Sequence, residues 1–75
     1  MYIKRLKELR EDHDLKQSNI ADMLKMKQPQ YARYETGKRD LPLDNLITLA
    51  EFYKTSTDYI LGLTDTQSPY PKKIK

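Results

Sequence analysis

Residues 17–37, QSNIADMLKMKQPQYARYETG, decide how the chain folds. In the first part of this stretch Ile20, Ala21 and Leu24 recur at helical spacing, which predicts a short helix with one apolar face. The KMK segment at 25–27 then predicts a tight turn, with the methionine pointing inward between two lysines. The first half of the stretch thus predicts a short amphipathic helix followed by a turn.

The second half, residues 28–36, predicts a second helix with two unlike faces. Pro29 suits a first helical turn, and Gly37 can adopt the left-handed conformation that ends a helix. Successive residues turn by about 100°, which separates an aromatic and acidic side from a polar side. The inner face holds Tyr31, Tyr34 and Glu35, and the outer face holds Pro29, Ala32, Arg33 and Thr36, with Gln28 and Gln30 at its edges.

The outer face has the chemistry needed to read bases. It carries no aliphatic side chain larger than alanine, so close approach is possible. Amide and guanidinium groups donate and accept hydrogen bonds in bidentate pairs with base edges. We therefore expect a helix-turn-helix whose second helix enters a DNA major groove.

Size and composition limit other classes of function. The chain has 75 residues, enough for one small domain, and it has no cysteine for disulfides or thiolate metal sites. A single histidine, His13, argues against zinc. No apolar run reaches membrane-spanning length, and MYIKRLKELRED lacks the apolar block of a signal peptide. We expect a cytoplasmic protein without metal or cofactor.

The charge is small in total but unevenly distributed. The net charge is +3. Residues 25–39 carry five Lys or Arg side chains against the single carboxylate of Glu35, whereas residues 40–71 carry one lysine against five carboxylates. Such polarity would direct the basic segment toward a polyanion. A merely solvated surface is the alternative.

Two further helices are predicted before and after this stretch. Ile3, Leu6 and Leu9 recur every three residues among charged side chains, which predicts a helix over 2–12. Another helix is predicted over 43–53, and its high apolar content makes it the expected core helix.

A fifth helix and a tail complete the chain. Ser56 is the expected N-cap of a short helix that ends at Gly62. Residues 66–75 are polar and proline-containing, so we expect a disordered tail after a single domain over 1–65.

Five stretches, in this order and at these spacings, carry a resemblance to a known family. They read RLKELRED, LKQSNIADML, YARYETGKR, LDNLITLAEFY and STDYILGLTD, and the resemblance covers roughly residues 3–65. The chain resembles the phage repressor and Cro-like helix-turn-helix family, also called the xenobiotic-response-element family. This resemblance implies an all-α, compact five-helix, lambda-repressor-like domain that binds double-stranded DNA.

The resemblance places three residues at positions that commonly contact bases. These are Gln28, Pro29 and Arg33. For Gln28 the interpretation is adenine recognition, and a solvated first-turn residue is the alternative. For Arg33 it is bidentate contact with guanine, and a phosphate contact is the alternative. Pro29 replaces a possible hydrogen-bond donor, so it would contact a thymine methyl group.

Four residues are expected at DNA phosphates. Gln17 matches a family glutamine that binds a backbone phosphate and supports the first residue of the reading helix. Lys38 and Arg39 lie in the loop that commonly meets the opposite phosphate strand. Lys27 lies on the rim of the turn, which we expect to face phosphates.

The resemblance also implies an internal ion pair between Arg10 and Glu35. A lone buried carboxylate would be costly, so pairing is favoured over a catalytic role for Glu35. Besides Pro29, two positions depart from the family pattern. Lys25 replaces a frequent turn glycine, and Lys27 replaces a Ser or Thr N-cap.

These features predict a small transcriptional regulator, a repressor of bacterial, phage or mobile-element type. Family members bind pseudo-palindromic operators as two-fold dimers, and a homodimer is expected here, if only on DNA. Leu43, Ile47 and Tyr53 either form an exposed apolar patch for that dimer or lie in the core. The alternative is an antitoxin-like or adaptor module that binds a protein. No nucleophile–base pair or glycine-rich phosphate loop indicates an enzyme.

Overall fold

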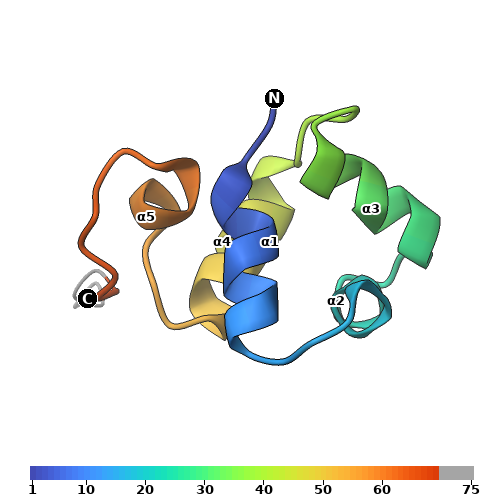
Figure 1. The fold of residues 1–75 in the computed structure, drawn as a ribbon, viewed down its shortest axis with the longest axis horizontal. Helices are drawn as coiled ribbons and strands as arrows, with labels where there is room; N and C mark the ends of the chain where they lie inside the picture. Colours follow the sequence, from blue (N-terminus) through green and yellow to red (C-terminus); the bar gives the residue numbers. More distant parts are fainter. Residues whose placement is uncertain (70–75) are drawn as a thin grey trace.

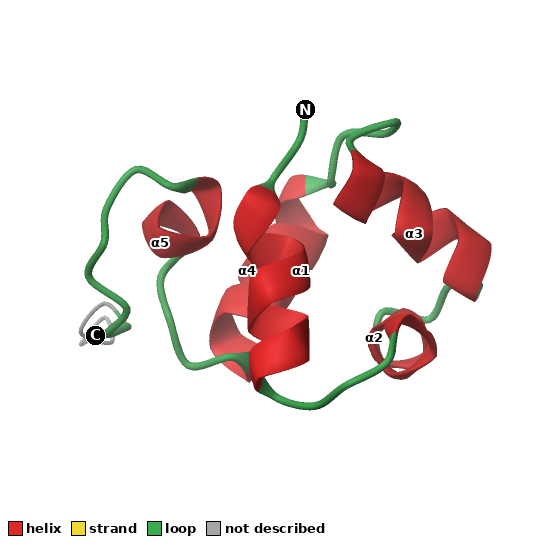
Figure 2. Ribbon diagram, viewed as in Figure 1, coloured by secondary structure: helices red, strands yellow, loops and turns green. Residues whose placement is uncertain are grey.

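The computed structural model describes residues 1–69, and this part of the chain contains five α-helices and no strand (Figures 1 and 2). The helices are α1 (Lys4–Asp12), α2 (Gln17–Met23), α3 (Gln28–Thr36), α4 (Leu43–Phe52) and α5 (Thr57–Leu61). The predicted all-α, five-helix fold is confirmed. None of these helices has the length and apolar character needed to cross a membrane.

The two helices of the expected reading motif lie at one end of the molecule. In Figure 1, α2 and α3 occupy one end, α5 the other, and α1 and α4 the middle. Helix α3 contacts both α2 and α1, while α5 contacts α1 and α4. The central pair of helices therefore forms a support from which α3 projects.

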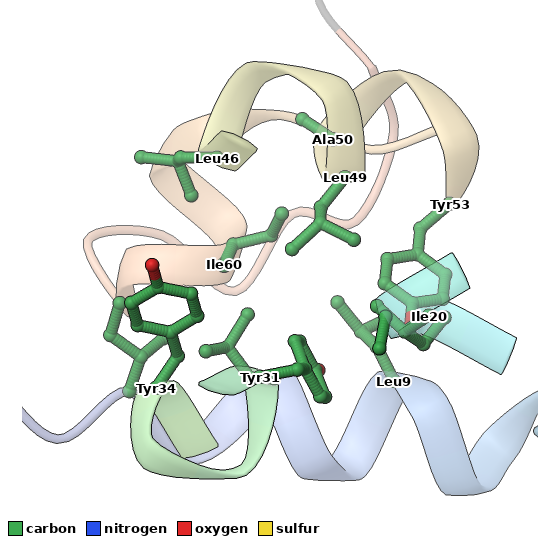
Figure 3. Packing of buried hydrophobic residues seen from close by; sticks show 12 residues of the cluster. Leu9, Ile20, Tyr31, Tyr34, Leu46, Leu49, Ala50, Tyr53 and Ile60 are labelled. Carbon is green, nitrogen blue, oxygen red and sulfur yellow. The ribbon is translucent and has the colours of Figure 1, made fainter. Parts of the chain in front are cut away.

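The core is built from one face of each helix (Figure 3). Leu6, Leu49 and Tyr31 have no exposed surface. Complete burial of a side chain of this size stabilises a fold by about 1.5–3 kcal/mol. The buried apolar set is Ile3, Leu6, Leu9, Ile20, Ala21, Tyr31, Tyr34, Leu46, Leu49, Ala50, Tyr53 and Ile60.

Three helices end on a non-glycine residue in the left-handed conformation. Asp14, Lys25 and Lys54 have φ of 54°, 58° and 55°. At the end of α2, the Lys25 N–H donates to the Asp22 carbonyl at 3.1 Å, and the next N–H donates to the Ala21 carbonyl at 2.9 Å. Both bonds satisfy carbonyls that the helix end leaves free. The turn therefore forms with Lys25 in the place of the family glycine.

The first helix begins later than predicted. It starts at Lys4, because Ile3 is extended, with φ −113° and ψ 93°. Tyr2 crosses Gly37 so closely that a Cβ on the glycine would lie 3.0 Å from the Tyr2 Cα. This long-range contact keeps the first residues out of the helix. Helix α4 ends one residue earlier than predicted, with Tyr53 as its C-cap.

Helix α4 buries less of its apolar surface than predicted. Leu46, Leu49 and Ala50 are buried, but Leu43 is 70% exposed and Ile47 and Phe52 are each 44% exposed. Of the alternatives for Leu43, Ile47 and Tyr53, burial holds for Tyr53 alone, which is 5% exposed.

The opposite end of the molecule is fastened by Arg5. Its guanidinium donates to the Tyr59 and Thr64 carbonyls at 2.7 and 2.5 Å and to Asp65 at 2.7 Å. It also lies 4.0 Å from the centre of the Tyr59 ring. Residues 66–69 form no helix and are exposed. The remainder of the predicted tail, 70–75, lies outside the described residues, and its disorder stays a prediction.

Candidate nucleic-acid interface

Helix α3 has the two faces expected from its periodicity. Tyr31, Tyr34 and Glu35 are buried. The other side is exposed at Gln28, Pro29, Gln30, Arg33 and Thr36, and half-buried at Ala32. Pro29 lies in the first helical turn, and Gly37 ends the helix with φ 82°. All three residues predicted to contact bases, Gln28, Pro29 and Arg33, therefore share one accessible face.

A chain of hydrogen bonds that starts in the interior joins the N-terminus of α2 to the N-terminus of α3. Arg10 donates to both oxygens of Glu35, at 2.7 Å from Nε and 3.0 Å from Nη2. The third Arg10 contact is to the Leu15 carbonyl at 3.0 Å. Gln17 Nε2 donates to Glu35 Oε1 at 3.0 Å, and Gln28 Nε2 donates to Gln17 Oε1 at 2.6 Å.

This chain fixes the orientation of two amides. An ionised carboxylate only accepts hydrogen bonds, so Gln17 must turn its amino group toward Glu35. The Gln17 carbonyl then faces Gln28 and accepts its N–H. Gln28 is left with its carbonyl oxygen and one further N–H for an external partner. Gln17 retains one N–H, and its predicted phosphate contact stays a prediction.

Glu35 is held in the ionised state despite its position. Burial by itself raises the pKa of Glu35, but the hydrogen bonds from Arg10 and Gln17 outweigh burial and leave the pKa below its ordinary value. The same carboxylate raises the pKa of Arg10. Side chains of both partners are largely buried, with 12% of Arg10 and 3% of Glu35 exposed.

Two buried tyrosines adjoin this ion pair. Burial is the main cause that raises the pKa of the Tyr31 hydroxyl far above its ordinary value, and the Glu35 carboxylate adds to it. Burial likewise raises the pKa of Tyr53 to about 12. In residues 1–69 neither hydroxyl has a hydrogen bond of normal geometry. The carboxylate therefore acts on Tyr31 as a nearby charge.

The cations of residues 25–39 are all on the surface and uncompensated there. Lys25, Lys27, Arg33, Lys38 and Arg39 are exposed. The ion pairs found among residues 1–69 include none of these five cations. The only carboxylate of this segment, Glu35, is buried against Arg10. The surface of the segment is consequently more positive than its net charge indicates.

The loop that follows α3 is held against the end of the helix. The Arg39 N–H donates to the Arg33 carbonyl at 3.2 Å, which brings the two arginines together. Asp40, which follows Arg39 in this loop, is paired with the exposed N-terminal ammonium group of Met1. Lys38 and Arg39 thus lie at the C-terminal end of α3, and Lys27 and Gln17 lie at its N-terminal end.

One polar group of α3, the Tyr34 hydroxyl, ends close to this surface. The sequence favours packing for Tyr34 and leaves its hydroxyl free to reach solvent or a phosphate; the structure buries the ring, with 7% of the residue exposed. Its hydroxyl nevertheless lies 3.5 Å from the amide nitrogen of exposed Gln30. Helical spacing indicates the ring's direction but not where its polar tip ends. Among the described residues, no group of three His, Cys, Asp or Glu side chains is placed to hold a metal.

Comparisons with known proteins agree with this geometry. The family model described as helix-turn-helix matches residues 6–60. The uncharacterized HTH-type transcriptional regulator YobD of Bacillus subtilis (strain 168) is 42% identical over 69 residues, which are 92% of this chain and 62% of YobD. The HTH-type transcriptional regulator AnsR of the same organism is 33% identical over 75 residues, all of this chain and 65% of AnsR.

A third relative, the HTH-type transcriptional regulator ImmR of Bacillus subtilis (strain 168), is 39% identical over 59 residues, 79% of this chain and 46% of ImmR. The chain thus spans less than two thirds of the length of these relatives. No solved structure matches it significantly. By the matched model, the identities to these regulators and its five-helix fold, the chain belongs to the phage repressor and Cro-like (xenobiotic-response-element) helix-turn-helix family.

Proposed function

We propose that this chain is the DNA-reading domain of a small transcriptional repressor and inserts α3 into the major groove of double-stranded DNA. The observation that carries the proposal is the outer face of α3. Its amide and guanidinium groups are exposed there, next to cations that have no ion-pair partner among residues 1–69. The names of the relatives, all HTH-type transcriptional regulators, support the same function.

Sequence choice is assigned to Gln28, Pro29 and Arg33. Gln28 has a carbonyl and one N–H left by its bond to Gln17, which is the pair that adenine N6 and N7 require. Arg33 offers its guanidinium to guanine O6 and N7, and Pro29 packs against a thymine methyl group. Each bidentate pair discriminates against a wrong base by about 1–3 kcal/mol.

Affinity and register are assigned to phosphate contacts. Gln17 and Lys27 lie at one end of α3, and Lys38 and Arg39 lie at the other. A helix in the major groove has a phosphate backbone beyond each end of its reading surface, so the two groups would hold opposite strands. Such contacts are sequence-independent and are weakened by salt.

The operator is proposed to be a pseudo-palindrome bound by a homodimer that assembles at least on DNA. Two-fold symmetry would place the two α3 helices about 34 Å apart, one turn of DNA. Binding to chromosomal or phage DNA places the protein in the cytoplasm. No metal or cofactor has a role in this proposal.

Selection from a pool of random duplexes at physiological salt tests the proposal. Enrichment of an inverted repeat with half-site centres about 10 base pairs apart is expected. Retention without enrichment would reassign Gln28 and Arg33 to phosphates. A failure to retain any duplex, even at low salt, would reject DNA binding and favour a protein partner.

A further inference from the structure

A small hollow of about 150 Å³ lies on the flank of α3, between the helix and the loop that follows it. It is lined by Gln30, Arg33, Tyr34 and Arg39. Two of these side chains are cationic, two are neutral hydrogen-bonding groups, and none is a carboxylate. Its lining therefore favours an anion that can accept several hydrogen bonds.

The contacts that shape the hollow leave its side-chain hydrogen-bond donors available to a ligand. The backbone bond from Arg39 to the Arg33 carbonyl, at 3.2 Å, positions the loop against the helix. The Tyr34 ring is buried, so its hydroxyl has a fixed place at the base of the helix flank. Gln30 reaches that hydroxyl only at 3.5 Å, the upper limit for a hydrogen bond, and a stronger acceptor would replace this contact.

The two guanidinium groups are also free to bind an anion. Over residues 1–69 neither Arg33 nor Arg39 is part of an ion pair, and neither guanidinium donates a hydrogen bond. Arg33 and Arg39 both line the hollow, and an anion in it would reduce the repulsion between their like charges. Guanidinium groups match phosphate oxygens in a bidentate manner.

We propose that this hollow is the seat of one backbone phosphate of the bound duplex, with the Tyr34 hydroxyl, the Gln30 amide and the Arg39 guanidinium as its donors. The inference rests on the proposed DNA-binding function. A major groove is about 12 Å wide, so a helix inside it has phosphates along its flanks as well as bases before its outer face. For Tyr34 and Gln30 the sequence leaves a phosphate contact as one of two alternatives, and the hollow favours that contact for both.

The seat would also position Arg33. This residue lines the hollow and belongs to the outer face of α3, so a phosphate anchored beside it fixes how deeply its guanidinium reaches toward base edges. Tyr34 acts here as a phosphate contact and as a positioning residue for Arg33.

Tyr34→Phe is the sharpest test, because it removes the hydroxyl and keeps the buried ring. Affinity for random duplexes is expected to fall by about ten- to a hundredfold, the loss of one hydrogen bond to a charged acceptor. Affinity for the selected duplex should fall further, because Arg33 is then less well positioned at its base. Since tyrosine is neutral, the dependence of affinity on salt should not change. Tyr59→Phe, on α5 at the far end of the molecule, is the matched control and should bind as the unchanged protein does.

A phosphate-by-phosphate scan locates the seat. Duplexes that carry one uncharged methylphosphonate at each position in turn are titrated with the unchanged protein, Tyr34→Phe, Arg39→Gln and Gln30→Ala. At one position we expect the methylphosphonate to lower the affinity of the unchanged protein. At that same position it should have little effect on the three variants, because each has already lost a contact to that phosphate. Arg39→Gln should also lower the salt slope by about one unit, which Tyr34→Phe does not.

Failure of the seat and failure of DNA binding give different results. If the unchanged protein retains no duplex, the proposed function is wrong and the seat with it. If it binds duplex but Tyr34→Phe and Gln30→Ala bind equally well, the seat alone is wrong. Inorganic phosphate without DNA is the remaining control: saturable shifts of the Gln30 and Arg39 amide resonances, with duplex affinity unaffected in Tyr34→Phe, would make the hollow a free-anion site and overturn the proposal.

Discussion

Replacement of Glu35 by glutamine should remove a large part of the stability of this domain. The substitution preserves shape but leaves the guanidinium of Arg10, whose side chain is 12% exposed, without its counter-ion. Breaking a buried pair by removing one partner costs about 3–5 kcal/mol. The glutamine carbonyl can retain one hydrogen bond from Arg10, and water reaches the exposed part of that side chain, so we expect about 2–4 kcal/mol.

The total stability sets the scale of this effect. A domain of 75 residues has a free energy of unfolding of about 4–11 kcal/mol. Urea unfolding followed by far-ultraviolet circular dichroism measures the change, and the midpoint should fall while the slope stays constant. The matched control is Glu51→Gln on the exposed side of α4, which should change stability by less than about 0.5 kcal/mol. A loss at Glu35 no larger than that of the control would refute the reasoning.

A double-mutant cycle separates the ion pair from other roles of the two residues. Arg10→Met alone leaves Glu35, 3% exposed, as an unpaired carboxylate, and it should also destabilise strongly. Arg10→Met with Glu35→Met leaves no buried charge, so it should cost clearly less than the sum of the single changes. Additive costs would show that the two side chains contribute independently.

Three other predictions concern the turns, the tyrosines and the reading surface. Lys25→Gly and Lys54→Gly should each raise the free energy of unfolding by about 0.5–1 kcal/mol, because φ is 58° and 55° at these positions. The control Lys27→Gly, where φ is −80°, should not be stabilised. Equal stabilisation of all three variants in thermal unfolding would contradict the prediction. Tyr53 has a pKa of about 12 in the folded protein, against about 10 when unfolded. Its contribution to the free energy of unfolding is therefore fully present below pH 10, and about 2–3 kcal/mol is lost as the pH rises toward 12. Tyr53→Phe should make this loss smaller in urea unfolding measured from pH 9 to 12. Arg33→Ala should relax preference at one base step by about 1–3 kcal/mol in selection experiments, whereas Lys38→Ala should weaken binding to every duplex and lower the salt slope by about one unit; reversed behaviour would exchange the two roles.

Local features of the sequence were sufficient to predict most of the reading motif. The bounds of α3 and the faces of Tyr31, Tyr34 and Arg33 follow from a 100° rotation per residue and from the positions of Pro29 and Gly37, all of which act within one or two turns. The N-cap of α5 was equally local, since Ser56 accepts the Tyr59 N–H at 3.0 Å.

The features that were not predicted depend on contacts between distant residues. Helix α4 has more apolar residues than one face can hold, and its sequence alone does not say that Leu46 and Leu49 face inward while Leu43 faces solvent. Ile3 is extended because Tyr2 meets Gly37. The hollow on α3 depends on where the loop folds back, and helical periodicity carries no information about that.

The orientation of the Gln28 amide group is the clearest example of a property that no single residue determines. Arg10, Glu35, Gln17 and Gln28 are all visible in the sequence, but their order in the hydrogen-bond chain is not. Because the carboxylate only accepts, every amide after it is oriented in turn, and Gln28 offers its carbonyl and one N–H outward. A glutamine at position 35 could present either an amino group or a carbonyl to Gln17, and the orientation of Gln28 would then be undetermined. The buried charge therefore does more than stabilise: in the proposed complex it selects which hydrogen-bonding pattern an exposed side chain presents to DNA.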